Sequence, residues 1–172
     1  MDNEECKKLF SEIDICNYYY IFRLPGQKNV DDIMMCNIES QFQKYKIKIA
    51  TISYDMYYKQ SINNLLDNKP IIPTIIYIKD KLRMGEYLNT KYIYLVHDDP
   101  NNTYTHTTAQ SLVGRCCGYN KKLHQVIIYC DYNKIEQHYK WIKNNYDIEN
   151  IPKDAKYIKK TTREIKDICY YH

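Results

Sequence analysis

Short runs of apolar residues alternate along the chain with longer segments in which polar and apolar residues are mixed. Runs rich in β-branched and aromatic residues predict buried strands, and apolar residues three or four positions apart predict amphipathic helices. Strands are predicted at residues 17–24, 46–54, 73–79, 91–97 and 124–131. Helices are predicted at residues 30–45, 61–68, 103–115 and 133–146. This alternation predicts an α/β fold of three layers with a mainly parallel sheet of five or more strands.

Local signals refine two of the predicted helices. In the helix at 30–45, Ile33, Ile38 and Phe42 are spaced for one buried face, and Asn29 or Asp31 is a suitable N-cap. Ser61 is the expected N-cap of the next helix, which the prolines at 70 and 73 bring to an end.

The length of 172 residues fits one main domain. We expect that domain at residues 1–150 and a helical extension at 151–172, with its lysines and arginine on a solvated face. The 20 tyrosines and the many isoleucines, asparagines and lysines are typical of an AT-rich genome, and such a composition suits a large DNA virus.

Charge and cysteine content narrow the class of protein. A net charge of +4 permits contact with nucleic acid without requiring it. Seven cysteines without a CxxC pair indicate neither a disulfide framework nor a zinc site. The charged start MDNEECKKLF is unlike a signal peptide, and no apolar run has the length of a membrane span. We therefore expect an intracellular protein, cytoplasmic or virus-associated, that does not enter a membrane.

Two segments that follow predicted strands, and a third from the helix predicted after them, are the candidates for a functional site, because ligands of open parallel sheets bind at the carboxyl ends of strands. These segments are KDKLRMGEYL (79–88), HDDPNN (97–102) and, further along, TTAQSLVGRCCGY (107–119). In the last one, Gly114 and Gly118 flank Arg115, although the chain has four glycines in all. Glycines so placed suggest a close approach of the backbone to a ligand such as a phosphate.

These segments resemble, in order and spacing, the second RecA-like domain of superfamily 2 helicases. IIYIKDKLRMGEYL is similar to motif V of that family, HDDP to the Asp-x-Pro that precedes motif VI, and AQSLVGRCCGY to motif VI. The resemblance covers about residues 17–146.

The resemblance implies roles for particular residues. Arg115 would be the catalytic arginine that stabilises charge on the γ-phosphate of ATP, a task for which its planar, permanently charged fork is suited. Contacts to the nucleotide would come from Asp80, Gly85, Gln110, Ser111 and Gly114, with Gln110 and Ser111 as alternatives for the opening position of motif VI. Arg83, together with the motif V residues Asp80 and Gly85, would contact the nucleic-acid backbone.

Two departures from the family pattern matter. Gly118 stands where motif VI usually has a second arginine. The chain also lacks GxxxxGK followed by Ser or Thr, the loop that cradles nucleotide phosphates. ATP and its Mg²⁺ would therefore be held by a first RecA-like domain, in another chain or a missing segment, and this chain alone would not be an ATPase.

Further candidates come from the residues themselves. Tyr54, Tyr57, Tyr58 and Lys59, which follow the second strand, are the preferred group for stacking on single-stranded nucleic acid. Asp98 and Asp99 are expected to be solvated loop carboxylates, with a metal site as the less favoured alternative. The pairs Cys116-Cys117 and His97 with His106 are expected to serve packing or surface roles, and not nucleophilic or base catalysis.

Three functions remain open from the sequence. The leading hypothesis is the second half of a helicase or translocase, which supplies Arg115 in trans and binds single-stranded nucleic acid. The alternative is a helicase-derived module without catalytic activity that binds nucleic acid or protein. A small-molecule enzyme with the same fold is the third, and no nucleophile and base at suitable spacing support it.

Overall fold

The computed structural model describes residues 1–12, 14–81, 87–98, 112–116, 126–147, 149 and 151–152. Its elements are α1 (Asn3–Ser11), β1 (Tyr19–Arg23), α2 (Lys28–Lys44), β2 (Ala50–Tyr54), α3 (Ile62–Leu66), β3 (Thr74–Ile78), the 3₁₀ helix η1 (Thr90–Tyr92), β4 (Ile93–His97), α5 (Leu112–Cys116), β5 (Ile127–Tyr129) and α6 (Tyr132–Lys143).

The five strands form one sheet in the order β2-β3-β1-β4-β5, and every neighbouring pair is parallel. β1 lies at the centre, where Tyr19 stands opposite Thr74 of β3 and Ile93 of β4. All five residues of β1 and of β3 are buried, as expected for strands covered on both faces. The predicted parallel α/β fold is confirmed.

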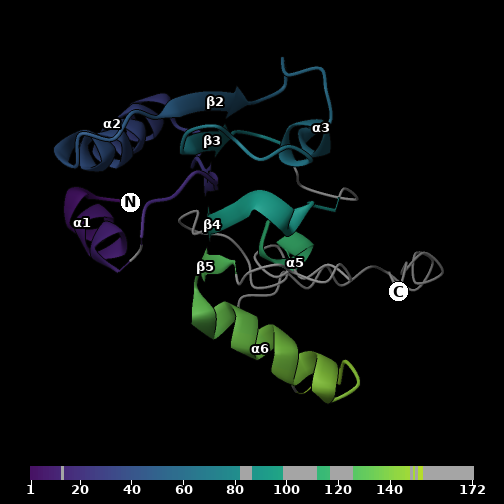
Figure 1. The fold of residues 1–172 in the computed structure, drawn as a ribbon. Helices are drawn as coiled ribbons and strands as arrows, with labels where there is room; N and C mark the ends of the chain where they lie inside the picture. The colour runs from purple at the N-terminus through teal and green to yellow at the C-terminus, as the bar shows by residue number, and fades with distance from the viewer. Residues whose placement is uncertain are drawn as a thin grey trace.

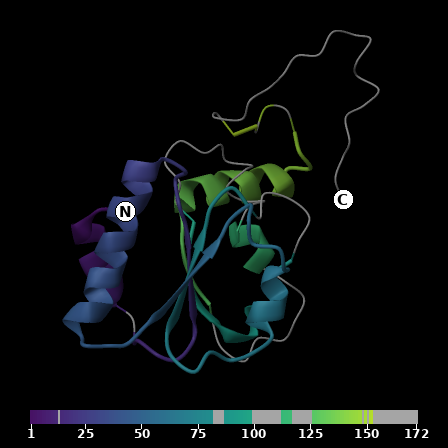
Figure 2. The ribbon, with the colours of Figure 1, turned by 90° about the horizontal axis from the view of Figure 1, so that it is seen from above.

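Helices cover both faces of the sheet, so the fold has three layers (Figures 1 and 2). Tyr20 and Phe22 of β1 pack with residues of α1 and α2 on one face, and Tyr19 and Ile21 pack with residues of α3 and α5 on the other. Side chains of a strand alternate between faces, which gives two separate cores. α6 lies beyond the edge strand β5, and none of its residues is fully buried.

The first helix is an element that the sequence analysis missed. Asp2 and Glu5 form a capping box: the Asp2 side chain accepts from the Glu5 amide at 2.9 Å, and the Glu5 carboxylate accepts from the Asp2 amide at 2.8 Å. Cys6, Leu9 and Phe10, spaced three or four residues apart, form the buried face of α1. The charged stretch MDNEECKKLF thus carries a helix signal that was interpreted only as evidence against a signal peptide.

α2 corrects two details of the expected helix. Its N-cap is Gln27, without a side-chain hydrogen bond, whereas Asp31 lies inside the helix. Ile33 is 61% exposed, and Met34 joins Ile38 and Phe42 on the buried face. Two of the three predicted positions are therefore confirmed, and Met34 takes the place of Ile33 on the buried face.

The end of α2 explains why β2 begins at Ala50 and not at residue 46. Lys46 has a left-handed φ of 56°, its amide bonds to the Gln43 carbonyl at 2.9 Å, and the Ile47 amide bonds to the Phe42 carbonyl at 3.0 Å. This is the Schellman ending of a helix, with lysine in the place that glycine usually takes. Lys46 and Ile47 therefore belong to the helix end.

Other expectations have mixed outcomes. Ser61 caps α3 as predicted, by accepting from the Asn63 amide. Of the helix predicted at 103–115, residues 103–111 lie outside the described part of the chain, and α5 runs from Leu112 to Cys116. The extension at 151–172 also lies almost entirely outside it, so the domain boundary stays a prediction. Among the described helices, none has both the length and the apolar character needed to cross a bilayer.

Phe42 offers a test of the core between α2 and the sheet. It is fully buried, with its ring edge-on to Phe10 at 4.9 Å and to Tyr20 at 5.6 Å between centroids. Phe42→Ala is expected to lower the free energy of unfolding by about 3–5 kcal/mol, measured by urea denaturation. The neighbouring exposed Gln43 provides the control, and Gln43→Ala should change stability by less than about 0.5 kcal/mol. Equal effects of the two substitutions would contradict this packing.

Candidate functional site

The carboxyl end of β1 is the topological switch point of the sheet. The chain leaves β1 toward the face of α2, whereas α3 and α5 of the later crossovers lie on the other face (Figure 1). Ligands of open α/β sheets bind where neighbouring strands send their connections to opposite faces. In this chain that position lies between the ends of β1, β3 and β4, and its charged side chains are Arg23, Lys79 and Asp98.

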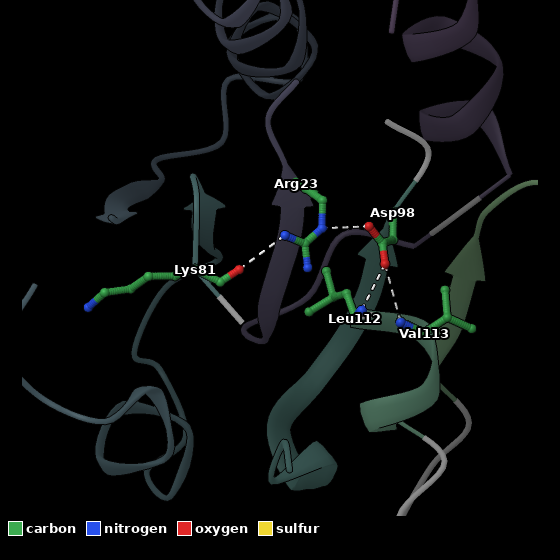
Figure 3. Close-up of polar contacts among 5 residues, drawn as sticks. All are labelled: Arg23, Lys81, Asp98, Leu112 and Val113. Atoms are coloured by element: carbon green, nitrogen blue, oxygen red, sulfur yellow. Dashed lines mark hydrogen bonds and ion pairs between the residues drawn. The ribbon is translucent and has the colours of Figure 1, made fainter. Parts of the chain in front are cut away.

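Arg23 and Asp98 form a buried ion pair across this position (Figure 3). Arg23 Nε lies 2.7 Å from Asp98 Oδ1, and the two side chains are 10% and 1% exposed. The Nη1 atom of Arg23 also donates to the carbonyl oxygen of Lys81 at 3.1 Å. The pair therefore joins the ends of β1 and β4 to the loop after β3.

The second oxygen of Asp98 holds the start of α5 (Figure 3). Asp98 Oδ2 accepts from the Leu112 amide at 2.9 Å and, more weakly, from the Val113 amide at 3.4 Å. The carboxylate thus satisfies two amides that a helix start leaves without an intrahelical partner. The expectation of a solvated carboxylate at Asp98 is wrong, because the residue is fully buried. Asp99 lies outside the described residues.

α5 is the described part, residues 112–116, of the sequence that resembles motif VI, and it includes the candidate site residues Gly114 and Arg115. Gly114 is exposed and lies inside the helix, so it is not a C-cap. Arg115 is 9% exposed, between Leu112 and Cys116, which are fully buried in the core beneath α5. Cys116 therefore has the packing role that was expected of it. Packing and the Asp98 contacts together fix the backbone from which the Arg115 side chain extends.

A second cluster lies in the loops after β2 and β3. Lys81 Nζ lies 4.5 Å from the ring centroid of Tyr54 and 5.9 Å from that of Tyr58, and it donates to the Tyr58 carbonyl. The two tyrosine rings are themselves 5.1 Å apart. Cation–π contacts and a hydrogen bond thus tie one loop to the other.

The residues that we expected to contact nucleic acid differ in how far they are exposed to solvent. Tyr54 is 3% exposed and offers no open ring face to a base. Tyr57 is 79% exposed at the tip of the loop, and Lys59 is exposed beside it. The Asp55 side chain accepts from the Tyr57 amide at 2.9 Å and so shapes this tip.

The other candidates from the loop after β3 and from motif VI are placed in part. Asp80 is described, with a left-handed φ of 56° directly before Lys81. Arg83, Gly85, Gln110 and Ser111 lie outside the described residues. Within the described part, no three His, Cys, Asp or Glu side chains are grouped so that they could hold a metal ion.

The sequence analysis did not foresee a small cavity on the face of α2. It has a volume of about 130 Å³, and Leu24, Ser53, Tyr77 and Lys79 are among its lining residues. Lys79 Nζ lies 2.8 Å from Asp31 Oδ2, and this hydrogen bond raises the pKa of Lys79. The other oxygen of Asp31 accepts from the Gly26 amide at 2.9 Å. Asp31, which was expected to cap α2, instead fixes the loop between β1 and α2.

Comparison with known proteins finds one viral relative. The chain is 55% identical over 170 residues to uncharacterized protein L594 of Acanthamoeba polyphaga mimivirus. The matched region is 99% of this chain and 43% of L594, so the chain spans less than half the length of that relative. Neither a known protein family nor a solved structure matches the chain. The relative agrees with the viral character that the composition suggested.

The Arg23–Asp98 pair can be tested by a double-mutant cycle. Asp98→Asn keeps an acceptor for the α5 amides but leaves the Arg23 charge without its carboxylate, and should cost about 3–5 kcal/mol of unfolding free energy. Arg23→Met combined with Asp98→Asn should cost clearly less than the sum of the single substitutions. Urea denaturation measures all three variants.

The matched control is the exposed pair between Lys140 and Glu136, 3.0 Å apart on α6. Glu136→Gln should cost no more than about 0.5 kcal/mol. Additive costs for Arg23→Met and Asp98→Asn would show that the two side chains do not interact in solution.

Proposed function

We propose that the chain is the second RecA-like half of a helicase or translocase. It would supply Arg115 to an ATP molecule held by a first RecA-like domain elsewhere. The single observation that carries this proposal is the attachment of α5 to the carboxyl edge of the sheet, through Asp98 and the Leu112 and Val113 amides. The order of the segments that resemble motifs V and VI supports it.

In this proposal, Arg115 stabilises a phosphate that comes from outside the domain. An arginine stabilises developing charge best when it is held in place before the phosphate arrives, because no reorganisation is then needed during the reaction. Arg115 lies on a helix whose start is fixed by a buried carboxylate and whose apolar side chains are in the core. The Mg²⁺ and the phosphate-cradling loop would come from the partner.

The surface beside Tyr57 and Lys59 supports contact with single-stranded nucleic acid. An exposed aromatic ring can stack on any base, and a neighbouring lysine can neutralise a phosphate. Both residues lie after β2, at the same edge of the sheet as the ends of β1 and β3. This arrangement would also serve a module that binds nucleic acid without hydrolysing ATP, which is the second candidate function.

Arg115 is tested by ATP hydrolysis in trans. The partner to use is a Walker-bearing domain from the same genome, and the part of L594 outside the matched region is a second choice. Wild-type chain should raise the ATPase rate of the partner, and Arg115→Ala should lower the raised rate on the order of 10³-fold. Arg115→Lys should keep little of the raised ATPase rate, because an ammonium group lacks the planar fork of the guanidinium. The same raised rate from wild type and Arg115→Ala would refute the role, and Lys140→Ala on α6 provides the control.

Tyr57 and Lys59 are tested by binding of a labelled dT12 single strand. Tyr57→Ala should weaken binding by about 1–3 kcal/mol, roughly 5- to 150-fold in Kd. Lys59→Ala should lower the slope of log K against log salt by about 0.7. Tyr132→Ala is the matched control, because Tyr132 is 71% exposed on α6. Equal affinity of all variants would remove this surface from the proposal.

A further inference from the structure

One side chain connects the two loops at the carboxyl edge. Lys81 donates to the Tyr58 carbonyl and lies over the ring of Tyr54, which is itself buried in the core with Ile62 and Leu66. Tyr57 and Lys59 flank Tyr58 in the same short loop. A ligand that stacks on Tyr57 therefore acts on a segment to which Lys81 is directly attached.

The backbone of the same residue is attached to the Arg23–Asp98 pair. The Lys81 carbonyl accepts from Arg23 Nη1 at 3.1 Å (Figure 3). Asp80, immediately before it, has a φ of 56°, a conformation that residues other than glycine seldom adopt. The side chain of Lys81 thus contacts the loop after β2, while its backbone contacts the ion pair.

The pair in turn is attached to α5. Arg23 and Asp98 are 10% and 1% exposed, and separating two charges at such depth costs several kcal/mol. A shift of Arg23 is therefore expected to carry the Asp98 carboxylate with it instead of breaking the pair. Asp98 holds the Leu112 and Val113 amides, and Arg115 follows two residues later.

We propose that Lys81, Arg23 and Asp98 act as positioning residues for Arg115 and that they couple its helix to the loop of Tyr57 and Lys59. A single strand bound at that loop moves Lys81, and the ion pair passes this movement to α5. The mechanical coupling stands on the contacts alone, whereas its use by nucleic acid rests on the function proposed above.

The coupling is measured first in the protein without ligand, through hydrogen exchange and NMR signals of the Leu112 and Val113 amides. Lys81→Met should speed the exchange of these two amides about tenfold and shift their signals. Lys81→Arg keeps a cation over the rings and should leave both the exchange rates and the signals as in wild type. In an Asp98→Asn background, Lys81→Met should add little. Unchanged Leu112 and Val113 amides in Lys81→Met, or the same added effect with and without Asp98, would overturn the proposal.

Lys44→Met is the matched control, because Lys44 Nζ also lies over a tyrosine ring, 5.6 Å from the centroid of Tyr45, at the end of α2. It should leave the α5 amides unchanged. Global stability, measured by urea denaturation for each variant, separates local loosening of α5 from general unfolding.

The use of this coupling by nucleic acid is measured with dT12. Binding should shift the Leu112 and Val113 signals in wild type, and Lys81→Met should bind dT12 while losing this response. If dT12 binds without any such shift, the regulatory step is wrong although the binding surface is right. If dT12 does not bind, the nucleic-acid role proposed above fails and the regulatory step fails with it, while the result for ligand-free Lys81→Met still decides the mechanical coupling.

Discussion

The ion pair between Arg23 and Asp98 is the interaction on which the carboxyl edge of this fold depends. It occupies the ends of two neighbouring central strands, and each partner uses its remaining hydrogen-bonding atoms on a different segment. Two charges buried at this depth stabilise a structure only when their geometry and their other hydrogen bonds are nearly complete. The loop after β3 and the start of α5 supply those bonds, so both segments are held where the pair requires them.

The rest of the molecule provides a rigid support for this edge. Alternation along β1 sends Tyr20 and Phe22 toward α1 and α2, and sends Tyr19 and Ile21 toward α3 and α5. Arg23 lies two residues after Ile21 and therefore on the same face of the sheet, which is the face that carries α5. Tyrosine is abundant in this chain, so hydroxyl groups are buried in the core and need hydrogen-bond partners there. The Tyr19 hydroxyl, for example, donates to the Leu65 carbonyl at 2.9 Å.

The candidate site could be predicted from sequence where its residues follow strands, and could not where its contacts cross the sheet. Motif order and position after a strand are what make Arg115 and Lys59 candidates, and their roles stay predictions. Asp98 was noticed but assigned to solvent, since nothing in HDDPNN shows that Arg23, 75 residues earlier, ends the neighbouring strand. Tyr54 was expected to contact nucleic acid, but it packs in the core with Ile62 and Leu66, which come from a later helix, and Lys81 lies over its ring.

The sequence by itself determined how many of the described strands there are and where each lies along the chain, the parallel α/β class and the cap of α3. Hydrophobic periodicity and capping residues give these features because they act over a few neighbouring positions. The sequence also contained the capping box of α1 and the end of α2, which are local signals that were overlooked. Only the tertiary structure decided which strands are neighbours, and therefore which charges meet. Strand order places β4 beside β1, and this arrangement of residues far apart in the chain converts Arg23 and Asp98 from two ordinary charged residues into the pair that fixes α5.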